Sequence, residues 1–188
     1  MLIRLILGSL ISAVLVFVWG FVFWTLLPFP KQILTSLPGQ ETFIEELKAA
    51  VPESGAYMIP GGMESASDED VLRRHAEGPI ATVLYHKAGA PPMAPKIFIQ
   101  GFLHMFVAAF IAGIIIAASE SNTYFSRVML IFWVGVFCAV WVEINNVVWW
   151  YFPRDYALMR MAYHLSSCLI MGIVLAAVVR PARLPEAA

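Results

Sequence analysis

Four long apolar stretches constrain the fold of this chain more than any other feature of its sequence. A helix needs about 20 mostly apolar residues to cross the ~30 Å hydrocarbon core of a bilayer. Four stretches reach that length: Leu5–Leu27, Ile97–Ala118, Val128–Trp150 and Ala157–Val179. Because lipid offers no hydrogen-bond partners to the backbone, segments this long must be helices. The sequence therefore predicts an all-α membrane bundle of four transmembrane helices.

The composition agrees with a membrane protein and excludes several other classes. Of the 188 residues, 60% are apolar and 13% charged, whereas soluble domains have roughly 45–50% and 25%. The net charge of −1 gives nothing to attract a nucleic-acid backbone. Two cysteines cannot form a disulfide framework. A disordered chain, a nucleic-acid binder and a typical cytosolic enzyme are all excluded.

The charges next to the spans predict the topology. Residues 1–27 form the first transmembrane helix, which is too long for a cleaved signal and serves as an anchor. Residues 28–96 form an insert, and 97–188 form a three-helix unit with a short cytoplasmic tail. Arg4, Arg127, Arg180 and Arg183 then lie on one side, while the short loop on the other side carries Arg154. The positive-inside rule places both termini in the cytoplasm and the insert outside.

The insert is predicted to be a small extracytoplasmic α/β domain. An amphipathic helix spans Glu41–Val51, with Phe43, Ile44, Leu47 and Ala50 on its apolar side. A capping box at Ser67 and Asp70 starts a second helix that runs to about Ala76. Strands are predicted around 57–59 and over 80–86, which gives a two- or three-stranded sheet with helices on one face. The core of such a unit is thin, so we expect it to lean on the membrane helices or on a partner.

Three titratable residues on three different spans lie at one level of the predicted bilayer. His104, Glu143 and His164 each lie about seven residues from the outer end of their span, or about 10 Å deep. Ionisable groups inside a membrane are costly and mark functional sites by default. A second polar residue lies three or four positions from each, on the same helix face. The predicted inward-facing polar cluster is Gln100, His104, Glu143, Asn146, Arg160 and His164.

Several roles for this cluster remain open at the level of sequence. A structural network would pair Arg160 with Glu143 and fix the register of the helices. A cofactor site would use His104, His164 and Glu143 as ligands of a metal, or the two histidines as axial ligands of haem. A quinone or proton site is the remaining interpretation. The cofactor stays unknown, and the spacing of these residues matches no metal motif.

The other candidate features point away from catalysis. The second span carries a face of small residues suited to close helix packing, within the chain or against a partner: Gly101, Ala108, Ala109, Ala112 and Gly113. Cys138 and Cys168 lie near mid-bilayer, where thiols behave as small apolar groups. No nucleophile motif or phosphate-binding loop is present. We therefore expect a non-enzymatic accessory or scaffolding subunit of a larger membrane complex, with a redox component or an oligomeric transporter as alternatives.

Short aromatic and proline motifs carry a resemblance to a known group of proteins. They are Trp19-Gly20, Trp24 to Pro28, Pro52-Glu53-Ser54-Gly55 and Trp149 to Tyr156. The chain resembles an uncharacterised group of small bacterial membrane proteins with four spans and an outer insert. The resemblance implies a bacterial inner membrane and a periplasmic insert, with the lipid bilayer and other membrane subunits as partners. It carries over no functional residue.

Overall fold

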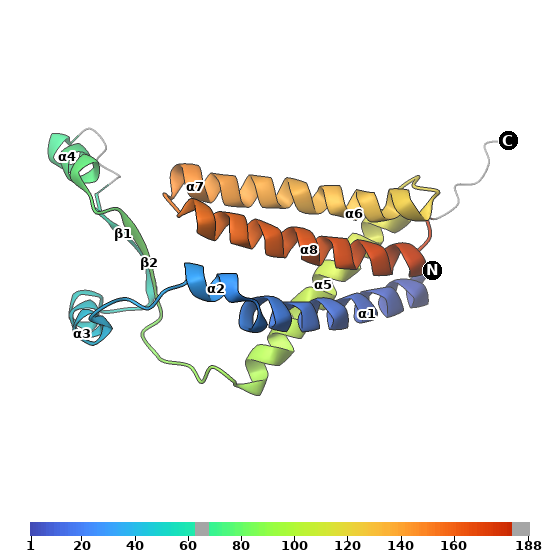
Figure 1. The fold of residues 1–188 in the computed structure, drawn as a ribbon, viewed down its shortest axis with the longest axis horizontal. Helices are drawn as coiled ribbons and strands as arrows, with labels where there is room; N and C mark the ends of the chain where they lie inside the picture. The colour runs from blue at the N-terminus through green and yellow to red at the C-terminus, as the bar shows by residue number, and fades with distance from the viewer. Residues whose placement is uncertain (63–67, 182–188) are drawn as a thin grey trace.

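A computed structural model describes residues 1–62 and 68–181 (Figure 1). Within these residues, four helices are long and apolar enough to cross a membrane: Leu2–Leu26, Pro95–Ala118, Tyr124–Trp149 and Arg154–Val178. The first consists of α1 (Leu2–Phe21) and the π-helical turn η1 (Val22–Leu26), and the second is α5 (Pro95–Ala118). The third consists of α6 (Tyr124–Ala139), the π-helical turn η3 (Val140–Ile144) and α7 (Asn145–Trp149), and the fourth is α8 (Arg154–Val178). The prediction of four apolar helices is confirmed.

The third helix begins four residues before its predicted start at Val128. Thr123 and Ser126 form a capping box, in which each side chain bonds the backbone of the other residue, and this starts α6 at Tyr124. The helix therefore includes Arg127, whose side chain is only 9% exposed. Arg127 Nε and Nη2 donate to the carbonyl of Ala176 at 3.2 and 3.1 Å, near the end of α8. A cation at a helix C-terminus is stabilised by the carbonyls and by the helix dipole.

The helices run antiparallel in pairs, so the bundle has two distinct ends (Figure 1). One end, here called the insert end, carries the insert and the short turn between α7 and α8. The opposite end holds Arg127. Arg4 and Arg180 also lie there and help to line a cavity of about 340 Å³. At this opposite end Leu5, Ala109, Ala112, Ile116 and Leu175 pack into the core.

Helix α5 does not follow the other helices along its whole length. It packs against α1 and diverges from α6 and α8 towards the insert end (Figure 1). Within the predicted small-residue face, Ala109, Ala112 and Gly113 are buried, whereas Ala108 is exposed and Gly101 half-buried. The small residues therefore bring the helices together at the end opposite the insert.

The insert is an extended ribbon with a helix at each end (Figure 1). It comprises α2 (Pro28–Ile33), α3 (Gln40–Ala50), β1 (Gly55–Ile59), α4 (Glu69–Glu77) and β2 (Ala81–Tyr85). The two strands pair antiparallel, from Gly55 opposite Tyr85 to Ile59 opposite Ala81. Two strands are thus confirmed, but the prediction of helices on one face of the sheet is wrong. A five-residue ribbon offers too little apolar surface to hold α3 and α4 against it, and they lie at opposite ends.

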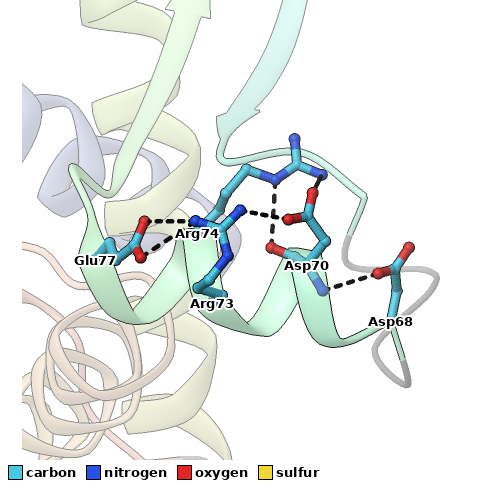
Figure 2. Close-up of polar contacts among 5 residues, drawn as sticks. All are labelled: Asp68, Asp70, Arg73, Arg74 and Glu77. Atoms are coloured by element: carbon cyan, nitrogen blue, oxygen red, sulfur yellow. Dashed lines mark hydrogen bonds and ion pairs between the residues drawn. The ribbon is translucent and has the colours of Figure 1, made fainter.

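Helix α4 is held by charged side chains on its own surface (Figure 2). Its N-cap is Asp68, whose side chain accepts a hydrogen bond from the backbone N–H of Asp70 at 2.9 Å. The predicted cap at Ser67 lies outside the described residues. Arg73 contacts Asp70 and Glu77, one helical turn away on either side. The hydrogen bond from Arg73 lowers the pKa of the Asp70 carboxyl below its ordinary value of 3.8.

One aromatic contact joins this part of the insert to the bundle. The ring of His75 on α4 lies edge-on to the ring of Tyr151, with 5.5 Å between the centroids. Tyr151 belongs to the turn between α7 and α8 and has a positive φ of 56°. The tip of the insert therefore reaches back to the insert end of the bundle.

Candidate functional site

The side chain of Glu143 is fully buried between two spans. It lies in the π-helical turn η3 of the third span and has no solvent exposure. Its Oε1 atom lies 2.9 Å from Nε of Arg160 and 3.3 Å from Nε2 of His164, both on α8. These three residues, here called the triad, come from adjacent helices that the sequence separates by a short turn. The structure thus brings together three of the six residues of the predicted polar cluster.

Arg160 and His164 lie four residues apart on one face of α8 and remain partly exposed. The Arg160 side chain is 30% exposed and that of His164 is 43% exposed. The guanidinium of Arg160 lies over the ring of Tyr156, 5.5 Å from its centroid, and Nη1 lies 3.4 Å from the Tyr156 hydroxyl. Tyr156 therefore supports the guanidinium from the side of the insert end.

The π-helical turn explains why Glu143 points at α8. Residues four apart in an α-helix are offset by about 40° around its axis. Two such steps, from Gly135 to Ala139 and on to Glu143, would carry Glu143 about 80° away from the seam with α8. A π turn accommodates one more residue per turn, so Glu143 returns to the seam beside the buried Ala139. No proline or glycine marks this turn in the sequence, and sequence reasoning missed it.

Two glycines set the distance between α6 and α8. A Cβ atom on Gly135 would lie 2.6 Å from Cβ of Cys168, and one on Gly172 would lie 3.0 Å from the carbonyl oxygen of Val128. The backbones therefore approach more closely than any side chain would allow, as small residues permit in membrane bundles. This spacing holds Arg160 and His164 within reach of a carboxylate on the facing helix.

One oxygen of the buried carboxylate is left without a partner. Within the described residues, Glu143 Oε2 makes no hydrogen bond, and neither do the buried hydroxyls of Ser12 and Ser167. Buried polar atoms are almost always paired, so each exception calls for an explanation. The unpaired Oε2 lies next to two partly exposed donors, and that combination makes the triad the candidate site.

The other three predicted cluster residues lie apart from the triad. His104 and Gln100 are exposed, and neither forms a hydrogen bond or ion pair within the described residues. His104 lies five residues before the buried Ala109, about 140° round α5, so it points away from the packed face. Asn146 is half-buried, and its backbone carbonyl accepts hydrogen bonds from Trp150 and Phe152 at the end of α7.

Aromatic side chains beside the triad connect α1 to α8, which the sequence alone did not indicate. Tyr163 packs against Phe23 and Trp24 of η1, with ring centroids 5.0 and 5.4 Å away. The indole Nε1 of Trp19 donates to the hydroxyl of Ser166 at 2.9 Å. Aromatic side chains of the first span therefore hold α8, the helix that carries two of the three triad residues, in place beside the triad.

The described residues contain no group of three or more His, Cys, Asp or Glu side chains that could hold a metal ion. Both cysteines are free, with Cys138 exposed and Cys168 half-buried. Chemically, the triad offers one buried carboxyl group, an arginine nitrogen that donates to it and an imidazole nitrogen 3.3 Å from it. All three groups keep further hydrogen-bonding capacity.

A second candidate surface lies on the insert. Helix α3 has no buried residue, and Phe43 and Ile44 on its apolar face are 45% and 44% exposed. Leu84 of β2 is 77% exposed. Within the described part of residues 28–94, Pro30 and Val71 are the buried side chains. The expectation of a thin core is confirmed.

Comparison with protein families adds one finding. A family model described as "Protein of unknown function (DUF1761)" matches residues 56–176, which is more than half of the chain. The chain belongs to this family. The DUF1761 match runs from β1 into α8 and so includes the triad and the ribbon of the insert. The comparisons with curated proteins and with solved structures found no match.

Proposed function

We propose that this protein is a non-catalytic accessory or scaffolding subunit of a larger membrane complex, respiratory or photosynthetic, in a bacterial inner membrane. Both termini would lie in the cytoplasm and the insert in the periplasm. The observation that carries the proposal is the insert, which presents apolar side chains without a core of its own to cover them.

The insert is too thinly packed to be a self-sufficient domain. Small units without disulfides or metals need a dense core, whereas this one buries Pro30 and Val71 within its described residues. An exposed apolar stripe on a helix is the usual recognition element for a partner that lies in a groove or packs alongside. We infer that a second protein covers α3.

The charges around the stripe define the chemistry of that partner. Phe43, Ile44 and Leu47 are flanked by the carboxylates of Glu41, Glu45 and Glu46. The partner is therefore an extramembrane segment of another subunit, with apolar side chains bordered by lysine or arginine. Charge complementarity of this kind fixes the register of an interface.

Site-specific crosslinking tests the proposal. A photoreactive residue at position 43 lies on the stripe, and one at Glu45, about 200° round the helix, is the matched control. Crosslinking in native membranes should give one adduct of defined mass from position 43 and none from 45. The substitution Phe43→Ser should prevent reconstitution with the purified partner.

Two results would contradict the accessory role. One is a monomer in native membranes, with no adduct from position 43. The other is an adduct with a second copy of the same chain alone, which would instead favour an oligomer such as a small transporter.

A further inference from the structure

The buried carboxylate of the triad lacks a hydrogen-bond donor. Oε1 of Glu143 accepts a hydrogen bond from Nε of Arg160 and lies 3.3 Å from Nε2 of His164, while Oε2 is buried and without a partner in the described part of the chain. A carboxylate offers about four acceptor sites, and an unpaired buried oxygen retains its full desolvation penalty. The missing partner is a group that donates a hydrogen bond.

Two nitrogens of the triad are also free to form hydrogen bonds. The described residues provide no hydrogen bond to Nη2 of Arg160 or to Nδ1 of His164. Both side chains are partly exposed, at 30% and 43%. Oε2 of Glu143 can accept a hydrogen bond and Nη2 of Arg160 can donate one, so the triad matches a ligand group that both donates and accepts.

The position of the triad favours entry from the bilayer. Arg160 lies six residues after the start of α8 at Arg154, which is about 9 Å along the helix. The triad therefore lies just below the end of the apolar span, where a lipid-soluble molecule keeps its polar head. At this end α5 diverges from α6 and α8 (Figure 1), and the side chains of Arg160 and His164 on α8 remain partly exposed.

We propose that the triad binds the polar head of a lipid-soluble molecule that carries a hydroxyl group. Because Oε2 has no exposed surface, the head enters as the partly exposed Arg160 and His164 side chains move aside. Its hydroxyl then donates to Oε2 of Glu143, and an oxygen of the same head accepts from Arg160 or His164. A head with only negative oxygens does not fit, because it would face the Glu143 carboxylate without offering a proton. Quinols and the glycerol headgroup of phosphatidylglycerol share the required chemistry, and the site does not depend on the docking role of α3.

Ligand retention by the full chain in phosphatidylcholine nanodiscs tests this proposal. The two probes are a short-tailed benzohydroquinone and phosphatidylglycerol, added separately and counted per chain by native mass spectrometry. One molecule of one probe should be retained per chain, and the retained probe identifies the source of the hydroxyl. An infrared difference spectrum should show a shifted carboxylate band on binding, which is absent in Glu143→Gln.

Two histidines provide a matched pair of variants. His164→Ala removes a member of the triad and should weaken retention about tenfold or more, the cost of one hydrogen bond to a charged group. His104→Ala removes an exposed histidine outside the triad and should leave retention unchanged. His164→Ala keeps the ion pair of Glu143 with Arg160, so it remains informative if Glu143→Gln fails to fold.

Three results would overturn the proposal. Neither probe is retained, or retention is equal in His164→Ala and His104→Ala, or binding leaves the carboxylate band unchanged. The last result would mean that Oε2 is satisfied by water or by the protein itself.

Discussion

Replacing Gly135 by alanine should separate the two helices that carry the triad. The new Cβ atom would lie 2.6 Å from Cβ and 2.8 Å from Sγ of Cys168, whereas ordinary contact begins at 3.4 Å. The helices must therefore move apart by about 0.8 Å at this level, the difference between 3.4 and 2.6 Å. Overpacking lowers the free energy of unfolding by about 1–3 kcal/mol. The better helix propensity of alanine raises it by up to about 1 kcal/mol.

Because 2.6 Å is far inside ordinary contact, the overpacking cost falls in the upper part of that range, at about 2–3 kcal/mol. The expected net loss in the free energy of unfolding is then about 1–2 kcal/mol. For a chain of this size, this corresponds to a fall in Tm of roughly 2–8 °C. Thermal unfolding in a mild detergent, followed by near-ultraviolet circular dichroism, measures the change. Gly101→Ala is the control, because its nearest neighbour would be a ring carbon of Phe17 at an unstrained 3.8 Å.

A double-mutant cycle separates the clash from other causes. Cys168→Gly removes the atom that the new methyl group meets, so Gly135→Ala with Cys168→Gly should be more stable than the sum of the two single changes implies. A clash between positions 135 and 168 is excluded if Gly135→Ala unfolds at the wild-type temperature, or if the coupling between the two sites is zero.

Three further predictions follow from other contacts. Glu143→Gln leaves Arg160 without its counter-ion and should lower the free energy of unfolding by about 3 kcal/mol, near the low end for a broken buried pair because Arg160 is partly exposed; titration with a denaturing detergent measures it. Trp19→Phe removes the indole donor to α8 and should cost about 1 kcal/mol in the same assay. The lowered pKa of Asp70 means that its contact with Arg73 stabilises α4 fully above the ordinary value of 3.8 and is lost as the pH falls through the lower folded value. An NMR titration of Asp70 should show its pKa returning towards 3.8 in Arg73→Gln.

The membrane helices were predictable because length and apolarity alone decide them. A run of about 20 apolar residues has few alternatives to a spanning helix, and the described part of the chain contains four helices of that length and apolarity. The start of the third helix was less predictable, since the charge of Arg127 indicates a boundary in the sequence. It lies inside the bundle because its guanidinium reaches the carbonyl of Ala176, a partner that belongs to another helix.

The triad was partly predictable, because depth can be counted along a helix but direction depends on packing. Glu143, Arg160 and His164 share a level, and their helices are joined by a turn that forces them to be neighbours. His104 was predicted at the same level by counting residues, but the direction of its side chain follows from the small residues that fix α5 against its neighbours. The π turn that directs Glu143 depends on packing against α8 and has no counterpart in hydropathy or turn residues.

The two strands of the insert were predictable from the sequence, but the placement of the helices beside them was not. The β-branched and aromatic residues of β2 indicate a strand, and pairing with β1 follows from its proximity in the chain. The placement of α3 and α4 could not follow from their own patterns. An amphipathic helix needs an apolar surface to pack on, and the short ribbon does not supply one.

The π turn in the third span lets one helix meet two separate requirements. Towards the opposite end, Gly135 needs regular helical geometry to pack against Cys168, and beyond the turn Glu143 needs to face the same neighbour. In a regular helix the directions of Gly135 and Glu143 around the axis would be fixed relative to each other, so a rotation that improved the packing of one would turn the other away from α8. The extra residue in Val140–Ile144 works as an angular offset between them. Insertion or deletion of a single residue here would turn the acidic group in or out of the seam while leaving the glycine contact in place, so length variation at this turn would act on the site alone.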